Sequence, residues 1–248
     1  MFALIIILAL LGWLVGSGIN HAANILPTRQ TLFQQPSCFN CGLPQGRSQW
    51  SALVSLLTNR RGCTNCGASP SKFTRALLVE LITPLLFGFL GWWYGLTPYL
   101  GLVLIYTAVL ILVTVTDLEH RLIFNIVILP AILLAIGAAF VTPGMTWRAG
   151  MVGGVAAFIM VYIAVLVSRG GLGEGDVTLS TFLGFIMGFP HIILSLTFGV
   201  FLGGFVAFAL LVTRRVTLKT FIPYGPFLTT TGWIMLIWGE EIWRYYFW

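Results

Sequence analysis

Charged residues are scarce in this chain. Of 248 residues, 7 are Asp or Glu and 13 are Lys or Arg, so that 8% of the sequence carries charge. An ordinary soluble domain has about 25% charged residues. This shortage, together with a hydrophobic fraction of 58%, excludes an ordinary soluble globular domain.

The sequence also lacks the alternating ten-residue segments of a membrane β-barrel. It has instead recurring apolar runs of about 20 residues, the length of a membrane-spanning helix. We therefore predict an all-α polytopic membrane protein with about eight transmembrane helices, at 1–19, 76–93, 98–116, 122–141, 149–167, 177–190, 191–212 and 226–240. The stretch 177–212 is divided at Phe189-Pro190-His191 because one helix would be too long for a single crossing. In the first helix, Gly12, Gly16 and Gly18 would let a neighbouring helix approach closely, and the alternative is that they only make the helix flexible.

Residues 20–75 differ from the rest, because they contain all 4 cysteines and no acidic residue. We predict a small extramembrane domain here, between helices one and two, and a membrane-embedded domain over 76–248. If residues 20–75 are cytoplasmic, alternation of the helices places 11 of the 13 Lys and Arg residues on the cytoplasmic side, as the positive-inside rule requires. The net charge of +6 thus reflects membrane topology rather than binding of nucleic acid.

The four cysteines form two CxxC pairs, Cys38 with Cys41 and Cys63 with Cys66, separated by 21 residues. This spacing is typical of a tetrahedral zinc site with four thiolate ligands. Four thiolates leave no open position on the metal, so the predicted zinc is structural. The alternatives are disulfide or redox chemistry, although disulfides rarely persist in the cytoplasm, and unpaired thiols.

Four of the 7 acidic residues lie in two short polar breaks where apolar runs end. Asp117 and Glu119 lie in the first break, and Glu174 and Asp176 in the second. Carboxylates at a membrane edge are costly and often mark chemistry or transport. Both breaks fall on the cytoplasmic side of the predicted topology.

Asp117 and Asp176 are the candidate catalytic pair, with Gly173, Glu174 and Gly175 as the loop that leads to Asp176. Two neighbouring carboxylates share one proton, because like charges cannot both ionise easily. The ionised member would deprotonate water, and the protonated member would polarise the scissile carbonyl. Structural alternatives are a helix N-cap for Asp176 and a simple helix end, near Arg121, for Asp117. We treat Glu119 and Glu174 as flanking groups.

Three other function classes are compatible with some of these features. The four carboxylates would bind magnesium in a membrane transferase that acts on a lipid phosphate. A transporter would use them as a proton relay, but would have polar residues deeper within its helices. A scaffold that presents a zinc domain leaves the clustered carboxylates unexplained.

The ordered motifs resemble those of the type IV prepilin peptidase family, which are GxGD intramembrane aspartyl proteases. Gly173-Glu-Gly-Asp176 is similar to the family's GxGD motif, and Asp117-Leu-Glu-His-Arg121 to its first aspartate segment. The paired cysteines, Leu78-Val-Glu80-Leu-Ile-Thr83 and Ile222-Pro-Tyr-Gly-Pro-Phe227 also match in order and spacing. The chain departs from the family pattern at Ile25, Glu174 and Thr178.

This resemblance implies a multi-pass protein of the bacterial inner membrane, with its zinc domain and active site at the cytoplasmic face. It implies cleavage of prepilins and pseudopilins within the membrane, after a glycine, followed by methylation of the new N-terminal residue with S-adenosylmethionine. The resemblance also implies that Glu80 would take part in the methyltransferase reaction. As an alternative, Glu80 is a solvated carboxylate near a helix start.

Overall fold

The computed structural model describes residues 1–28, 41, 43, 50–58, 66, 72–168, 172–217, 220 and 222–247. Regular structure within these residues is entirely helical. The chain divides into two units, Met1–Leu112 and Val113–Trp248. Cys38 and Cys63 lie outside the described residues, and so does the predicted zinc site that depends on them.

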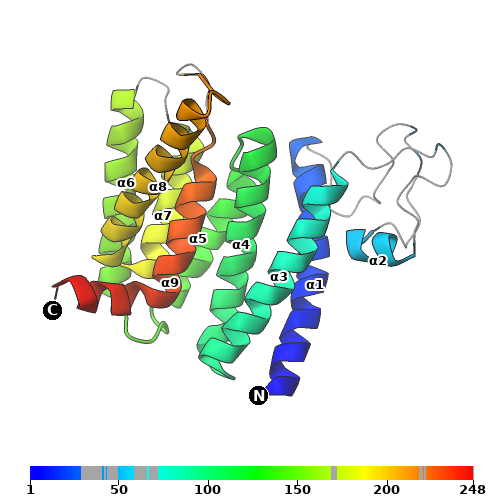
Figure 1. The fold of residues 1–248 in the computed structure, drawn as a ribbon. Coiled ribbons are helices and arrows are strands. Elements are labelled where there is room, and N and C mark those ends of the chain that lie inside the picture. Colours follow the sequence, from blue (N-terminus) through cyan, green and yellow to red (C-terminus); the bar gives the residue numbers. More distant parts are fainter. Residues whose placement is uncertain are drawn as a thin grey trace. The chain divides into compact units, whose positions relative to one another are not determined.

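The first unit contains α1 (Phe2–Ile25), η1 (Leu26–Thr28), α2 (Ala52–Leu57), α3 (Phe73–Tyr94) and most of α4 (Pro98–His120). Helices α1 and α3 run antiparallel and pack along their lengths (Figure 1). The first helix continues to Ile25, six residues beyond the predicted run. The chain therefore leaves α1 later than the sequence suggested.

Glycines on α1 allow this close packing. A Cβ at Gly12 would lie 2.8 Å from Pro84 Cα, and a Cβ at Gly16 would lie 3.3 Å from Thr83 Oγ1. Gly18, in contrast, has no atom within 4 Å of such a Cβ. The predicted close approach is thus confirmed at Gly12 and Gly16, whereas the prediction for Gly18 is wrong.

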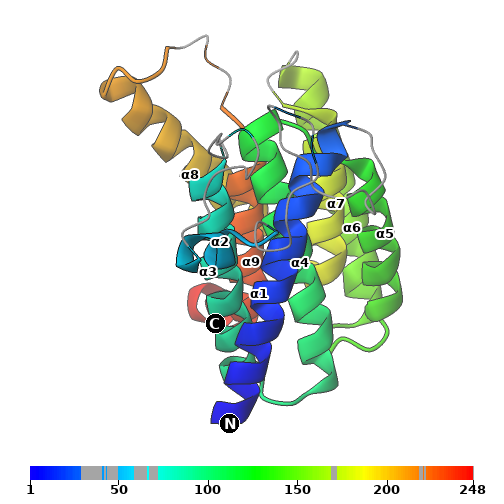
Figure 2. The ribbon, with the colours of Figure 1, turned by 90° about the vertical axis from the view of Figure 1, so that its right-hand side faces the viewer.

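The second unit contains the end of α4, then α5 (Asn125–Ala138), α6 (Trp147–Ser168), α7 (Glu174–Met187), α8 (His191–Val212) and α9 (Gly225–Phe247). Helix α7 is the central helix, and it packs against α5, α6, α8 and α9 (Figure 2). Ten of its 14 residues are buried. Close contact with α6 requires glycine, since a Cβ at Gly153 would lie 2.5 Å from the Gly184 carbonyl oxygen.

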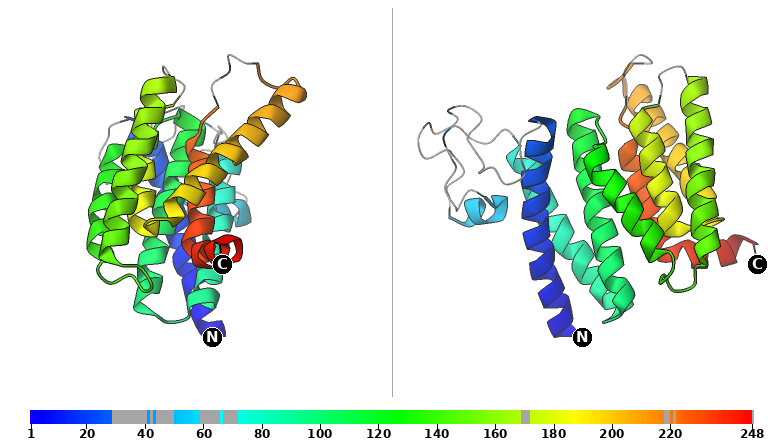
Figure 3. Two further views of the ribbon diagram at one scale, coloured as in Figure 1. Left: turned by 90° about the vertical axis from the view of Figure 1, so that its left-hand side faces the viewer. Right: turned by 180° about the vertical axis from the view of Figure 1, so that it is seen from behind.

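The predicted division between two helices at Phe189-Pro190-His191 is confirmed, because α7 ends at Met187 and α8 begins at His191. The second half of α8 leans away from α9, and no residue after Gly203 in this helix is buried (Figure 3). The start of α7, the end of α4 and the start of α9 all belong to this unit.

Among the described residues, five helical segments are long and apolar enough to span a membrane. They are Phe2–Thr28, Phe73–Tyr94, Pro98–His120, Trp147–Ser168 and His191–Val212. Helix α5 is apolar but shorter, with 14 residues. These helices agree with a polytopic membrane protein, as the sequence predicts.

Gly12 offers a test of the α1–α3 packing. Gly12→Val would force a side chain against the backbone atoms Pro84 Cα and Thr83 O, which no rotamer change can relieve. We expect the free energy of unfolding to fall by about 1–3 kcal/mol, as is typical of overpacked sites. Thermal unfolding in detergent would measure the change. Gly18→Val is the matched control on the same helix, and equal losses from both variants would contradict the close packing at Gly12.

Candidate active site

The two aspartates of the chain, which are its only ones, lie in the second unit at helix ends. Asp117 lies in the last turn of α4, and Asp176 is the third residue of α7. Each side chain is only 6% exposed. Burying a carboxylate costs free energy unless it receives hydrogen bonds, so the donors around each aspartate influence how easily it ionises.

Asp117 accepts a hydrogen bond from the backbone N–H of Gly225, at 2.9 Å between N and Oδ2. The two residues are 108 positions apart in the sequence. Only glycine fits at the first residue of α9, because a Cβ there would lie 2.6 Å from Asp117 Oδ2. The other oxygen, Oδ1, has no hydrogen-bond partner among the described residues.

Asp176 accepts a hydrogen bond from the backbone N–H of Gly173, at 3.0 Å between N and Oδ2. Gly173 is the N-cap of α7, and the Asp176 carboxylate reaches back to it from the first turn. The aspartate therefore supports the helix start without being the N-cap itself. Its Oδ1 is likewise without a hydrogen-bond partner in the part of the chain that the structure describes.

The charges of the two aspartates influence each other. Asp176 lies just ahead of the apolar run that begins at Val177, and burial raises its pKa to about 6. The hydrogen bond from Gly173 opposes this shift, whereas the nearby charge of Asp117 adds to it. The arrangement suits a pair of carboxyl groups that holds one proton between them.

Glycine also shapes the approach to Asp176. A Cβ at Gly175 would lie 2.8 Å from Ile123 Cβ, so the start of α7 packs directly on the segment that follows α4. Arg121, at the beginning of that segment, has a positive φ of 54°. Gly175 thus allows the segments next to both aspartates to come into contact.

Tyr224 is a residue of this site that the sequence reasoning did not single out. Burial, and then the charge of Asp176, raise its pKa to about 12, so the phenol keeps its proton and is a hydrogen-bond donor. Its ring lies against glycines of α8, since a Cβ at Gly203 would be 3.3 Å from Tyr224 Cε2. The signal that could have revealed it is a glycine between two prolines, Pro223-Tyr-Gly-Pro226.

The flanking glutamates differ from the aspartates in their surroundings. Glu174 is exposed, and Glu119 lies 3.6 Å from the His120 imidazole. No group of three or more His, Cys, Asp and Glu side chains within the described ranges is placed to hold a metal ion. Of these four carboxylates, the two aspartates are therefore the ones that are buried.

Glu80 belongs to a separate buried network in the first unit. Its side chain is 1% exposed, so the interpretation as a solvated carboxylate is wrong. One oxygen accepts from Ala52 N at 2.9 Å and Asn20 Nδ2 at 3.3 Å, and the other from Ser51 Oγ at 2.5 Å and Leu53 N at 2.9 Å. Glu80 thus holds the start of α2 against α1 and α3.

The remaining polar groups of this network come from α1. Trp13 Nε1 donates to Ser51 Oγ at 3.2 Å, and Asn20 Nδ2 donates to the Ala76 carbonyl at 2.9 Å. Two buried acceptors, Asn20 Oδ1 and Ser17 Oγ, have no hydrogen-bond partner in the described part of the chain. The contacts of Asn20 with Ala76 and Glu80 of α3 depend on packing, so the sequence alone does not reveal them.

Comparison with protein families gives two matches. Residues 104–208 match the type IV leader peptidase family, and residues 10–94 match the bacterial peptidase A24 N-terminal domain. Among curated proteins, a prepilin leader peptidase/N-methyltransferase of Aeromonas salmonicida is 31% identical, over 84% of this chain and 73% of that protein. The chain belongs to the type IV leader peptidase family.

Other relatives extend the similarity over nearly the whole chain. The prepilin leader peptidase/N-methyltransferase of Pseudomonas aeruginosa is 28% identical over 98% of this chain and 93% of its own length. The one from Bacillus subtilis is 26% identical over 97% and 96%, respectively. No solved structure matches. In this leader peptidase family member, the peptidase match includes both aspartates, whereas the N-terminal match includes Glu80 and its partners.

The interaction between the aspartates can be measured directly, since the chain has no others. In Asp117→Asn, we expect the pKa of Asp176 to fall below about 6, because the charge that disfavours its ionisation is gone. Infrared titration with ¹³C-aspartate would report Asp176 alone in this variant. Glu240→Gln, which leaves both aspartates in place, is the control. An unchanged or higher pKa of Asp176 in Asp117→Asn would show that the two carboxyl groups do not interact.

Proposed function

We propose that this chain cleaves the leader peptide of type IV prepilins and then N-methylates the new N-terminal residue. Relatives that carry the name prepilin leader peptidase/N-methyltransferase support both activities. The observation that carries the proposal is the pair of buried aspartates, each with one oxygen without a hydrogen-bond partner among the described residues. Those oxygens are free to meet a water molecule and a peptide carbonyl.

The chemistry needs one ionised and one protonated aspartate. The ionised carboxylate takes a proton from water, and the water oxygen bonds to the carbonyl carbon of the scissile peptide. The protonated carboxyl group donates its proton to the carbonyl oxygen. The carbon–nitrogen bond then breaks, and the leaving nitrogen takes a proton from the carboxyl group that removed it from water. At the same time the other aspartate, now ionised, takes a proton back from a hydroxyl group on the same carbon, so that the new carboxyl group forms and the pair again holds one proton.

Magnesium-dependent transfer to or from a lipid phosphate is the alternative. It would require Glu119 and Glu174 to join the aspartates as ligands. The exposure of Glu174 and the contact of Glu119 with His120 do not favour such a set. We therefore infer proteolysis rather than phosphate chemistry at this site.

Neutral substitutions of the aspartates test the peptidase. We expect Asp117→Asn and Asp176→Asn each to reduce cleavage of a synthetic prepilin at least about a thousandfold, because neither amide can exchange the required proton. The assay would run in detergent with a magnesium chelator present. Glu119→Gln and Glu174→Gln are matched controls and should cut at nearly the wild-type rate. Cleavage by either aspartate variant at the wild-type rate, or loss of wild-type cleavage with the chelator, would refute the assignment.

We assign the methyltransferase to the first unit, where the N-terminal family model matches. S-adenosylmethionine would supply the methyl group. Its ammonium group needs buried acceptors, and Asn20 Oδ1 and Ser17 Oγ would provide them. All four donors at Glu80 come from the protein itself, so Glu80 would position the α2 segment for this reaction rather than act as its base.

Glu80→Ala should separate the two activities. The change leaves two backbone N–H groups, a hydroxyl and an amide without their acceptor, at a cost of about 1–3 kcal/mol for each unsatisfied group. We expect N-methylation to fall at least about tenfold, while cleavage stays within about threefold of wild type, because the aspartates belong to the other unit. Mass spectrometry of the cleaved substrate measures both products. Glu241→Gln is the control, and a parallel loss of both activities would show that Glu80 is needed only for folding.

The metal and the topology complete the proposal. Cys38, Cys41, Cys63 and Cys66 would hold a structural zinc, which the spacing of the two CxxC pairs supports. Eight crossings of the bacterial inner membrane would place residues 20–75 and both aspartates at the cytoplasmic face, where most Lys and Arg residues then also lie. Pseudopilins would be substrates of the same site.

A further inference from the structure

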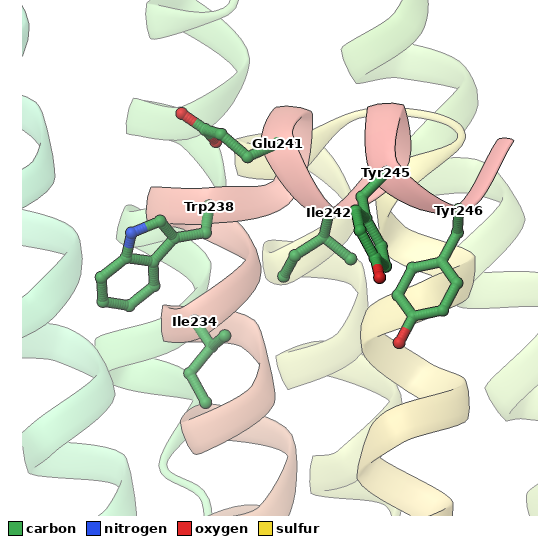
Figure 4. A pocket seen from close by; sticks show the side chains of 6 residues that line it. All are labelled: Ile234, Trp238, Glu241, Ile242, Tyr245 and Tyr246. Carbon is green, nitrogen blue, oxygen red and sulfur yellow. The ribbon is translucent and has the colours of Figure 1, made fainter. Parts of the chain in front are cut away.

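Helix α9 changes direction after Trp238, and a hollow lies in the angle of the bend (Figure 4). The part before the bend is packed inside the second unit, with Met235, Leu236 and Ile237 buried. The hollow has a volume of about 520 Å³. It is lined by Ile234, Trp238, Glu241, Ile242, Tyr245 and Tyr246. Gly225, which contacts Asp117, lies 9 residues before Ile234, the nearest lining residue, or about 14 Å along the helix, so the hollow is distinct from the aspartate pair.

The bend lies at one end of a membrane-spanning helix. His191, the first residue of α8, has its Nε2 3.5 Å from Glu240 Oε2, and its ring makes an edge contact with Trp243 at 6.1 Å. Since α8 is one of the candidate spans, its first residue lies where the hydrocarbon core ends. The C-terminal segment of α9 therefore lies at the level of the lipid headgroups.

The side chains in the hollow suit that level. Ile234 and Ile242 provide an apolar surface, and Trp238, Tyr245 and Tyr246 have apolar rings with polar tips. Trp and Tyr are enriched where a membrane meets water for this reason. Tyr245 is 83% exposed and Tyr246 is 66% exposed, which is costly for large rings unless lipid covers them. An acyl chain would cover the apolar surface, and the tyrosine hydroxyls would donate to phosphate or ester oxygens.

Charge distinguishes between lipid headgroups. Glu240 lies 3.8 Å from the Arg244 guanidinium as well as near His191, so its charge is compensated. Glu241, at the rim of the hollow on the Trp238 side, has no ion-pair partner among the described residues (Figure 4). An uncompensated carboxylate repels an anionic headgroup and attracts an ammonium group, and aromatic rings also attract such a cation.

We propose that the hollow in the bend of α9 binds a membrane phospholipid whose headgroup carries an ammonium group. The acyl chain lies on Ile234 and Ile242, and the ammonium group pairs with Glu241. This binding site is independent of the peptidase reaction.

Native mass spectrometry of the full-length protein tests the site. The protein would be released from micelles that contain a series of concentrations of either phosphatidylethanolamine or phosphatidylglycerol. The number of lipid molecules bound to each protein would be counted at each lipid concentration. We expect phosphatidylethanolamine to bind about five times more tightly than phosphatidylglycerol, which is the difference in affinity that a partly exposed ion pair typically gives. Glu241→Gln should abolish this preference, and Tyr245→Ser should weaken the binding of both lipids.

Glu240→Gln is the matched control, because it removes the same charge one residue away and outside the hollow. It should keep the preference. Prepilin cleavage in all three variants should match wild type, which shows that each protein is folded. The proposal is overturned if Glu240→Gln and Glu241→Gln behave alike, if phosphatidylglycerol binds as well as phosphatidylethanolamine, or if Tyr245→Ser leaves the lipid count unchanged.

Discussion

A carboxylate buried in an apolar protein must receive hydrogen bonds, and in this chain the donors are mainly backbone N–H groups. Asp117 receives one from Gly225, Asp176 one from Gly173, and Glu80 two from the start of α2. In two of these cases the donor comes from a distant part of the sequence. The few buried acids therefore act as cross-links, and the positions of α2 and of the start of α9 depend on them.

The donor count also separates the roles of these acids. Glu80 has four protein donors on its two oxygens, which is enough to stabilise its charge and hold it in place. Each aspartate has one hydrogen-bond donor, on a single oxygen, among the described residues. A carboxyl group that keeps an oxygen available can exchange protons with water, whereas one that is fully bonded is suited to a structural role. The same functional group, a carboxylate, is thus fully hydrogen-bonded in one unit and keeps an available oxygen in the other.

Much of this architecture could be predicted from the sequence, because it depends on local patterns. Apolar runs predicted the helices, and a proline marked the boundary between α7 and α8. Glycines predicted that a helix would pack closely on α1, although not which helix. The aspartates were recognisable as the acids at two polar breaks. These features need no knowledge of which segments meet in space.

The rest depended on contacts between distant segments. The hydrogen bond from Gly225 to Asp117 cannot be recognised from the sequence around either residue. The same is true of the burial of Glu80 by Ser51 and its neighbours. A solvated carboxylate was one of the two interpretations of Glu80, because charged residues near helix starts usually face water, yet residues of α1 and the start of α2 bury it. The bend of α9 was missed for a similar reason, since Trp238 and Gly239 continue an apolar run that ends only at Glu240.

The bond between Gly225 and Asp117 has a consequence for the order of biogenesis. A ribosome makes the chain from its N-terminus, so α4 is complete long before α9 exists. Until α9 has been made and has packed, Asp117 has no N–H donor from Gly225. The hydrogen bonding of Asp117 is therefore completed only late in synthesis, when the start of α9 reaches the end of α4.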